Sequence, residues 1–349
     1  MRAGRPGVWV FAVVMAGFLA SAAPASAFFK LLKLLKSEDV SKCERGATPP
    51  AERLGSCDRA LGGYVWPWID RAGLLFGRGT ARYHLGDLDG AIRDFDDGLR
   101  LTPRSSRLFL NRGMARARKG DRDGALADFT SAIESDPTEA LAYSNRSSSY
   151  LERGRLDDAE KDINEAIRLD AQSAGAYANR AAILGAKKQF DRAMADADRA
   201  IRLKPDFARG YVVRGGLNNQ QDRHDRALPD LDKAISLDPG NAEAYHHRGI
   251  ARNGTNDRVG ALADLDEALR LKPGRPESLL MRGGIYLALG KPEQALADLG
   301  QLPVEKLALP VQLAAYFLRG QAHYDVGKRT QAIADLDNAV KLDPANVDT

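Results

Sequence analysis

The stretch ADLDEAL at residues 263–269 has close copies elsewhere in the chain, and these copies decide the fold. The copies are LPDLDKAI from Leu228, ALADLGQL from Ala295 and AIADLDNAV from Ala332. In all four, an aspartate stands three residues after an alanine, as Asp264 does after Ala261. A catalytic acid does not need so many copies, so the pattern predicts a structural unit that is repeated along the chain.

The repeat has a period of 34 residues. Prolines recur at this step, and in units counted from residue 72 the twentieth position is always alanine. The prolines are Pro103, Pro137, Pro205, Pro239 and Pro273, and the alanines are Ala91, Ala125, Ala159, Ala193, Ala227, Ala261, Ala295 and, after a three-residue insertion, Ala332. The eighth position is glycine in six of the eight units. Small residues at fixed positions indicate places where two helices approach closely.

Each unit reads as a helical hairpin. It contains an apolar-periodic segment of about 13 residues, a turn such as LGD at residues 85–87, a second segment and a link that usually carries proline. Six of the eight second segments have Asp or Glu at the eighteenth position, where a carboxylate meets the positive end of a helix. One hairpin cannot bury its own apolar face, so neighbouring hairpins are predicted to stack into a solenoid.

This pattern resembles the tetratricopeptide repeat over residues 72–346. The resemblance implies an all-α, right-handed superhelical solenoid of eight helix-turn-helix repeats, numbered one to eight here, which start near residues 72, 106, 140, 174, 208, 242, 276 and 313. It also implies a non-catalytic scaffold that binds a protein or peptide partner. The predicted domains are therefore a segment at 28–71 and the solenoid at 72–349, after a leader at 1–27.

The recurring aspartate has an equally regular basic counterpart. Position 23 of every repeat is aspartate and position seven is arginine. The aspartates are Asp94, Asp128, Asp162, Asp196, Asp230, Asp264, Asp298 and Asp335, and the arginines are Arg78, Arg112, Arg146, Arg180, Arg214, Arg248, Arg282 and Arg319. These spacings predict one ion pair per repeat, formed either within a repeat or with the next one, that acts as a register device.

In the family, the concave groove is lined by positions two, five, six, nine and twelve of each first helix. The resemblance therefore implies a partner-binding groove containing Arg107, Leu110, Asn111, Met114, Ser144, Asn145, Ser148, Asn179, Arg209, Val212, Val213, His246, His247 and Asn253. Asn111, Asn145 and Asn179 lie one repeat apart. An amide both donates and accepts, so they are interpreted either as a ladder for an extended peptide or as small polar groups that keep the face soluble.

The first 27 residues have the order of a secretory signal peptide. Two arginines precede an apolar stretch at residues 8–20, and Ala25-Ser26-Ala27 follows. We therefore expect export, most simply to a bacterial periplasm, with an uncleaved signal anchor as the alternative. An exported chain can form disulfides, so Cys43 and Cys57, the only cysteines, are predicted to pair. Two free thiols are the alternative.

The segment FFKLLKLLK, Phe28–Lys36, places three lysines on one side of a helical wheel and the apolar residues around the rest. Two interpretations fit it, a contact with an anionic membrane surface and docking on the first repeat.

At the other end of the chain, the apolar stripe of the last helix predicts a homodimer or a partner contact through the C-terminal repeat, near Ile333 and Val340.

Composition argues against several other functions. The chain of 349 residues is 44% hydrophobic and 28% charged, and its net charge of +4 is spread without blocks of one sign. Nucleic-acid binding is therefore not expected, because it needs clustered basic residues. No catalytic, cofactor or phosphate-binding motif occurs, and the five scattered histidines do not form a metal motif. We expect no enzyme activity and no cofactor. The alternative function is a structural or regulatory subunit of a cell-envelope assembly or polysaccharide export machine.

Overall fold

The computed structural model of the chain describes residues 38–62 and 70–343. In these two ranges, eighteen α-helices and one short 3-10 helix form all of the regular structure and there is no strand, which confirms the predicted all-α class. The predicted signal peptide and the amphipathic segment Phe28–Lys36 lie outside the described residues. The chain divides into two compact units, residues 1–149 and 150–349.

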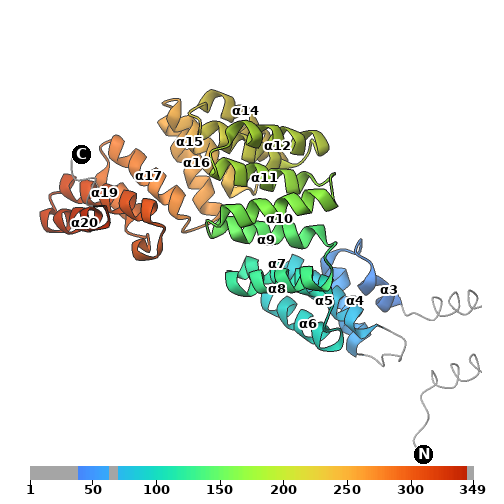
Figure 1. The fold of residues 1–349 in the computed structure, drawn as a ribbon. Coiled ribbons are helices and arrows are strands. Elements are labelled where there is room, and N and C mark those ends of the chain that lie inside the picture. The colour runs from blue at the N-terminus through green and yellow to red at the C-terminus, as the bar shows by residue number, and fades with distance from the viewer. Residues whose placement is uncertain (1–37, 63–69, 344–349) are drawn as a thin grey trace, which may run out of the picture. The chain divides into compact units, whose positions relative to one another are not determined.

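The first unit holds the N-terminal hairpin, repeats one and two, and most of the first helix of repeat three (Figure 1). Its helices are α3 (Glu38–Glu44), α4 (Pro50–Gly62), α5 (Arg71–Leu85), α6 (Leu88–Leu101), α7 (Ser106–Lys119), α8 (Arg122–Ser135) and α9 (Ala140–Glu152), the last of which ends in the second unit. Consecutive helices pack on one another from α3 to α8, and α5 also packs on α7.

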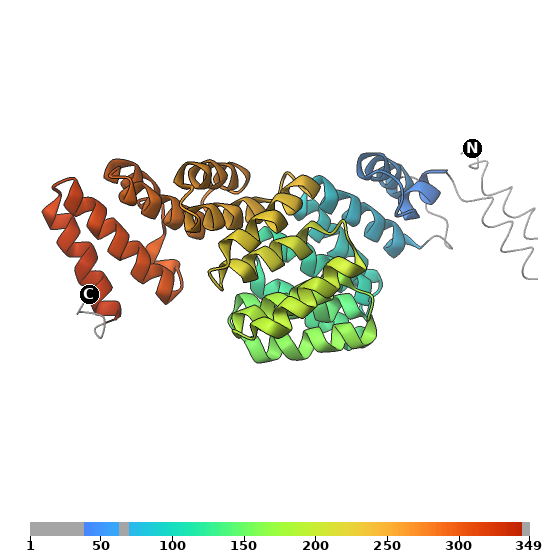
Figure 2. The same cartoon turned by 90° about the horizontal axis from the view of Figure 1, so that it is seen from above.

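The second unit continues the same arrangement. Its helices are α10 (Leu156–Leu169), α11 (Ala174–Ala186), α12 (Phe190–Leu203), α13 (Ala208–Asn219), α14 (His224–Leu237), α15 (Ala242–Gly254), α16 (Arg258–Leu271), α17 (Pro276–Ala288), α18 (Pro292–Leu299), η1 (Val304–Lys306), α19 (Leu309–Asp325) and α20 (Arg329–Leu342). Each helix packs on the next, so hairpins such as α11–α12 and α13–α14 stack side by side (Figures 1 and 2).

The turn inside each hairpin has one fixed conformation. Position fifteen of every repeat has a positive φ, for example 87° at Gly86 and 93° at Gly120, and glycine adopts this value without strain. The next residue often caps the second helix. The carboxylates of Asp87 and Asp121 accept hydrogen bonds from the backbone N–H groups of Gly90 and Gly124.

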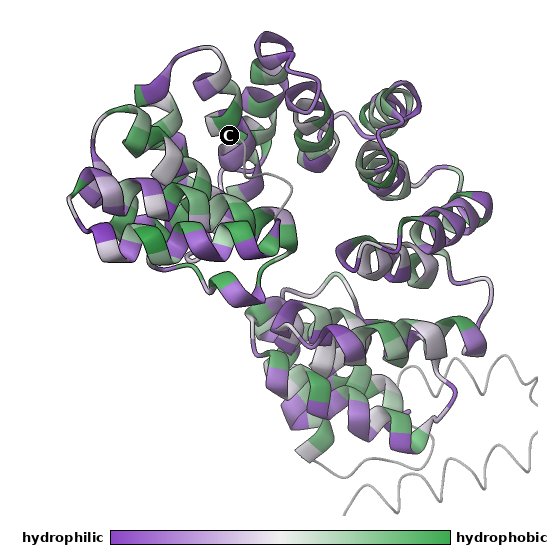
Figure 3. Cartoon of the chain, turned by 60° about the vertical axis from the view of Figure 1, so that its left-hand side comes forward, coloured by the Kyte–Doolittle hydropathy of each residue, from purple (hydrophilic) through white to green (hydrophobic). Residues whose placement is uncertain are grey.

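The glycine at position eight makes room for the large residue at position 24. A Cβ atom on Gly79 would lie 2.6 Å from the ring of Phe95, and one on Gly215 would lie 2.7 Å from Leu231. Phe95 and Leu231 are fully buried. The two helices of such a hairpin therefore meet at the glycine. Hydrophobic and hydrophilic residues alternate along the helices, as expected for helices with one buried side (Figure 3).

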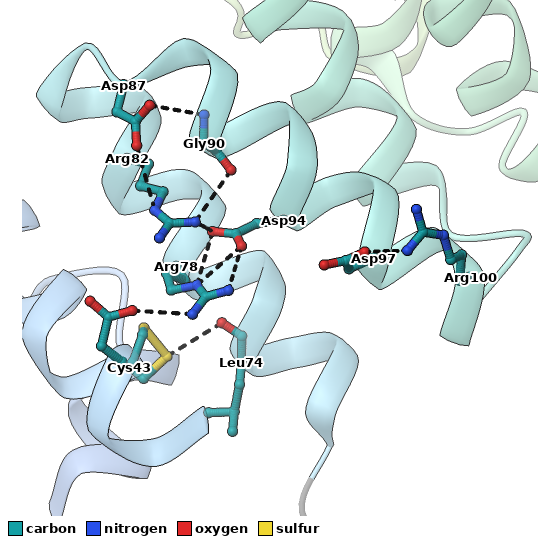
Figure 4. A network of polar contacts seen from close by, with 11 residues as sticks. Cys43, Leu74, Arg78, Arg82, Asp87, Gly90, Asp94, Asp97 and Arg100 are labelled. Carbon is teal, nitrogen blue, oxygen red and sulfur yellow. Dashed lines mark hydrogen bonds and ion pairs between the residues drawn. A yellow bond between two sulfur atoms is a disulfide. The ribbon is translucent and has the colours of Figure 1, made fainter. Parts of the chain in front are cut away.

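The predicted arginine–aspartate pairs form within repeats. In repeat one, Arg78 Nη2 lies 2.6 Å from Asp94 Oδ1, and Arg82 Nη1 lies 2.7 Å from Asp94 Oδ2 (Figure 4). Equivalent pairs are Arg112–Asp128, Arg180–Asp196, Arg214–Asp230, Arg248–Asp264, Arg282–Asp298 and Arg319–Asp335. The aspartates are buried, so each pair joins the two helices of a hairpin away from water.

The same arginines also bind the preceding repeat. Arg214 Nη1 donates to Asp198 at 2.7 Å, and Arg248 Nη1 donates to Asp232 at 2.7 Å. The acceptor stands at position 25 of the preceding repeat, on its second helix, and Asn164 takes this role for Arg180. The planar guanidinium has enough donors for both partners. The predicted arginine–aspartate pair therefore forms within a repeat, and the contact with the preceding repeat uses a different acceptor, at position 25. We call these contacts together the arginine ladder.

The N-terminal segment joins this ladder. The disulfide Cys43–Cys57 is formed and links α3 to α4, as predicted. Both helices pack on α5, and Asp58 on α4 accepts from Arg78 Nη1 at 3.1 Å. The hairpin α3–α4 thus occupies the place of a repeat that precedes repeat one.

The ladder is interrupted before repeat eight. Position 25 of repeat seven is Gly300, which has no side chain to accept from Arg319. Here α18 is short, η1 follows, and α19 begins at Leu309 rather than near residue 313. Pro310 lies in the first turn of α19. Backbone N–H groups in the first turn have no partner within the helix, so proline, which lacks this group, costs no hydrogen bond there.

Candidate functional site

The first helices of repeats four to eight form one face of the second unit. Along this face α11 packs on α13, α13 on α15, α15 on α17 and α17 on α19. Of the predicted groove residues here, Arg209 is exposed, while Val213, His247 and Asn253 are half-buried. We call the outward surface of these five helices the first-helix face.

The predicted groove residues of the first unit lie on α7 and α9. Arg107 is exposed, and its guanidinium stacks 4.4 Å from the ring centre of Phe76. Asn111 and Asn145 each donate from Nδ2 to the carbonyl four residues earlier, at 2.8 Å. Met114, Ser144 and Ser148 are half-buried, and Ser148 donates to the carbonyl of Ser144. The side-chain amides of Asn111 and Asn145 therefore each use one N–H donor inside their own helix.

The predicted groove wrongly included three residues that are buried between helices. Leu110 and Val212 are only 5% and 2% exposed, because the first helix of the next repeat covers them at Ala142 and Ala244. Asn179 at position six is also buried. These three side chains therefore belong to the packing between helices and are not available to a partner.

A cavity of about 510 Å³ opens on the first-helix face across repeats six to eight. It runs along α17 from Glu277 to Ala288 and is bounded by α15 on one side and α19 on the other. Its lining residues are His246, Ile250, Asn253, Arg258, Glu277, Leu280, Met281, Gly284, Ile285, Ala288, Val311 and Leu318. Most of them are apolar, and the charged residues lie toward the two ends.

His246 is a buried polar group in the wall of this cavity. It is 5% exposed, and its Nδ1 lies 2.9 Å from the hydroxyl of the fully buried Ser278. Burial, and then the neighbouring His247 and Arg275, lower the pKa of His246 to about 3. The imidazole is therefore neutral near pH 7 and contributes a weakly polar, uncharged surface to a mostly apolar wall.

Among the predicted groove residues, His246 and Asn253 line the cavity, and Ile250, at position nine of the same helix, follows from the same pattern. The list of predicted groove residues ended at repeat six, although positions five, six and nine of repeat seven give Leu280, Met281 and Gly284. Val311 could not be found in this way, because it precedes the predicted start of repeat eight. Among the described residues, no group of three potential metal ligands comes together, and no helix has the length and apolarity to cross a membrane.

The stacked hairpins, the glycine contacts and the arginine ladder define an all-α repeat protein. The tetratricopeptide-repeat family model matches residues 110–174, 178–242 and 250–302, more than half of the chain, and a second tetratricopeptide-repeat model matches residues 313–346. The chain belongs to the tetratricopeptide-repeat family. Proteins of this family are generally non-catalytic, and the fold is that of a protein-interaction scaffold. None of the curated proteins matches the sequence.

Solved structures share the fold at low sequence identity. The APC/C hetero-tetramer Cut9-Hcn1 has a TM-score of 0.66 at 14% identity, covering 88% of this chain and 60% of that one. The human IFIT1 dimer with PPP-AAAA has a TM-score of 0.63 at 16% identity, covering 85% and 74%. A tetratricopeptide repeat protein from Parabacteroides merdae has a TM-score of 0.54 at 20% identity, covering 70% and 98%. These likenesses show the fold alone.

Proposed function

We propose that the protein is a non-catalytic scaffold that holds an extended segment of a partner protein on its first-helix face. The observation that carries the proposal is the apolar cavity of about 510 Å³ along α17. Ligand sites are commonly concave and apolar with a few placed polar groups, and this cavity has that composition. Among the described residues, no group of three potential metal ligands accompanies this cavity.

The cavity dimensions suit a short extended peptide. Glu277 and Ala288 on α17 are eleven residue steps apart, a helical length of about 16 Å at 1.5 Å per residue. An extended chain covers that distance in about five residues. Leu280, Met281 and Leu318 would contact its apolar side chains. Arg258 is exposed and makes no ion pair within the described ranges, so an acidic group at that end would complement it.

Filling the cavity is expected to abolish partner binding without unfolding the protein. A Cβ atom on Gly284 meets only Leu318, at 3.8 Å, so a larger side chain has room to enter the cavity. We expect Gly284→Phe to lose the partner and Gly284→Ala to retain it. The measurement is photo-crosslinking in the native cell from a reactive residue at Met281, followed by mass spectrometry.

Two controls make this experiment decisive. Ala182→Phe adds the same ring at the same repeat position on α11, outside the cavity, and should leave the crosslinked partner unchanged. A reactive residue at Val259, 81% exposed on α16, should not give the partner band. If Gly284→Phe crosslinks the same partner as the unchanged protein, binding in this cavity is refuted.

The proposed location of this scaffold is the bacterial periplasm, with a secreted protein as the alternative. The signal-like residues 1–27 support export, and the disulfide Cys43–Cys57 fits an oxidising compartment. A place in a cell-envelope assembly or polysaccharide export machine, with Phe28–Lys36 on the membrane surface, is the second candidate. N-terminal sequencing of the protein from its native cell is expected to begin at Phe28, and an intact Met1 would contradict cleavage.

A further inference from the structure

The end of repeat eight carries an exposed apolar surface. Five large side chains on α19 and α20 contribute to it, with exposed fractions between 37% and 68%. They are Phe317, Tyr324, Ile333, Leu336 and Val340, and together with Asp337 they define the end face. In the part of the chain that the structure describes, nothing packs against this surface.

The interior repeats show what normally covers such a face. Leu265 and Leu269 stand at the positions of Leu336 and Val340, and they are 0% and 9% exposed. In repeat six, these residues lie under α17, the first helix of repeat seven. Val212, at the position of Phe317, is likewise covered by Ala244 of the next first helix. The end face thus has the composition of a surface that receives a first helix.

The end face also carries an unused acceptor of the arginine ladder. Asp337 stands at position 25 of repeat eight, where Asp198, Asp232 and Asp266 stand in repeats four to six. Each of those aspartates accepts from the arginine of the following first helix, at 2.6–2.7 Å. Asp337 is exposed and has no such partner among the described residues. An arginine on a covering helix would therefore find its acceptor in place.

We propose that the end face binds an amphipathic α-helix of a partner protein, placed as the first helix of a further repeat and anchored by an arginine on Asp337. The interior first helices define its sequence requirements. They carry a small or apolar residue four positions before the arginine, as Ala244 precedes Arg248, and Ala244 packs with Val212 and Ala234 of the preceding repeat. This site lies on another surface from the cavity and is independent of the function proposed for it.

A second copy of this chain fits the end face less well. Seven first helices are already covered by the preceding helix, α5 by α4, α7 by α6, α11 by α10, α13 by α12, α15 by α14, α17 by α16 and α19 by α18. Their ladder arginines are engaged as well, since Arg214, Arg248 and Arg282 each bind two aspartates. A folded copy therefore offers no uncovered first helix among these seven, and Arg319, which lacks an acceptor at Gly300, lies on one of them.

The test uses a peptide with the sequence of α15, residues 242–254, stapled into a helix and labelled with a fluorophore. Its arginine corresponds to Arg248. Fluorescence anisotropy with the full chain is expected to show saturable binding. Asp337→Asn should weaken it about threefold, and so should citrulline in place of the peptide arginine, because each removes one charge-assisted hydrogen bond at an exposed site. Combining both changes should cost little more than either alone.

Two further variants test whether the peptide binds on the end face. Val340→Glu places a charge in the middle of the end face and should abolish binding, whereas Val259→Glu, on an exposed site of α16, should leave it unchanged. Circular dichroism confirms that the variants are folded. Binding that is indifferent to Asp337→Asn and to Val340→Glu overturns the proposal. So does light scattering that shows a dimer which Ile333→Glu with Val340→Glu dissociates, because a second copy is then the occupant.

Discussion

Replacing Asp264 with alanine is expected to lower the free energy of unfolding by about 3–5 kcal/mol. The Asp264 side chain is 3% exposed and accepts hydrogen bonds from Arg248 Nε and Nη2, at 2.9 Å and 2.6 Å. Arg252 Nη1 lies 3.0 Å from the same carboxylate. Without it, two partly buried guanidinium groups lose their shared anion. Urea unfolding followed by circular dichroism measures the change.

The chain supplies a matched control on the same arginine. Asp232 accepts from Arg248 Nη1 at 2.7 Å, but its side chain is 60% exposed. An exposed pair contributes little, so Asp232→Ala should cost less than about 1 kcal/mol. Equal losses for the two variants would show that burial does not govern the ladder. An unchanged midpoint for Asp264→Ala would refute its role as a register device.

Removing the disulfide is expected to cost about 3 kcal/mol, because the bridge Cys43–Cys57 closes a loop of about 15 residues and restricts the unfolded chain. The loss should be local. Both cysteines are fully buried, and the carbonyl of Cys43 accepts from Arg53 Nε at 2.8 Å. In the Cys43→Ala, Cys57→Ala variant, hydrogen exchange should accelerate in α3 and α4 while α11–α14 stay protected.

Reduction of the unchanged protein provides the control for that experiment. Dithiothreitol should reproduce the exchange pattern of the double variant and should have no further effect on the variant itself. The native protein should show no reactive thiol before reduction, since Cys43 and Cys57 are its only cysteines. Stoichiometric thiol labelling without reductant would contradict the pairing. Faster hydrogen exchange throughout the repeats would show that the hairpin α3–α4 stabilises the whole solenoid and not only repeat one, on which it packs.

The sequence by itself determined the elements and their local pairing. The period of 34 placed seven of the eight first helices, and the recurring arginine and aspartate predicted pairs such as Arg248–Asp264. It could do so because these features are local: two helices joined by a short turn must meet, and a glycine opposite a large residue fixes where. Cys43 and Cys57 are also close in sequence, which made their pairing predictable.

Only the tertiary structure decided what lies between repeats. Sequence could not show that the following helix covers position five in repeats two and five, so Leu110 and Val212 were wrongly placed in a groove. Nor could it show that Arg248 also binds Asp232, since this contact needs the angle at which one hairpin stacks on another. The cavity along α17 likewise depends on the earlier start of α19, which brings Val311 to its wall. Stacking geometry is set by side chains from three neighbouring helices together, and no single repeat contains that information.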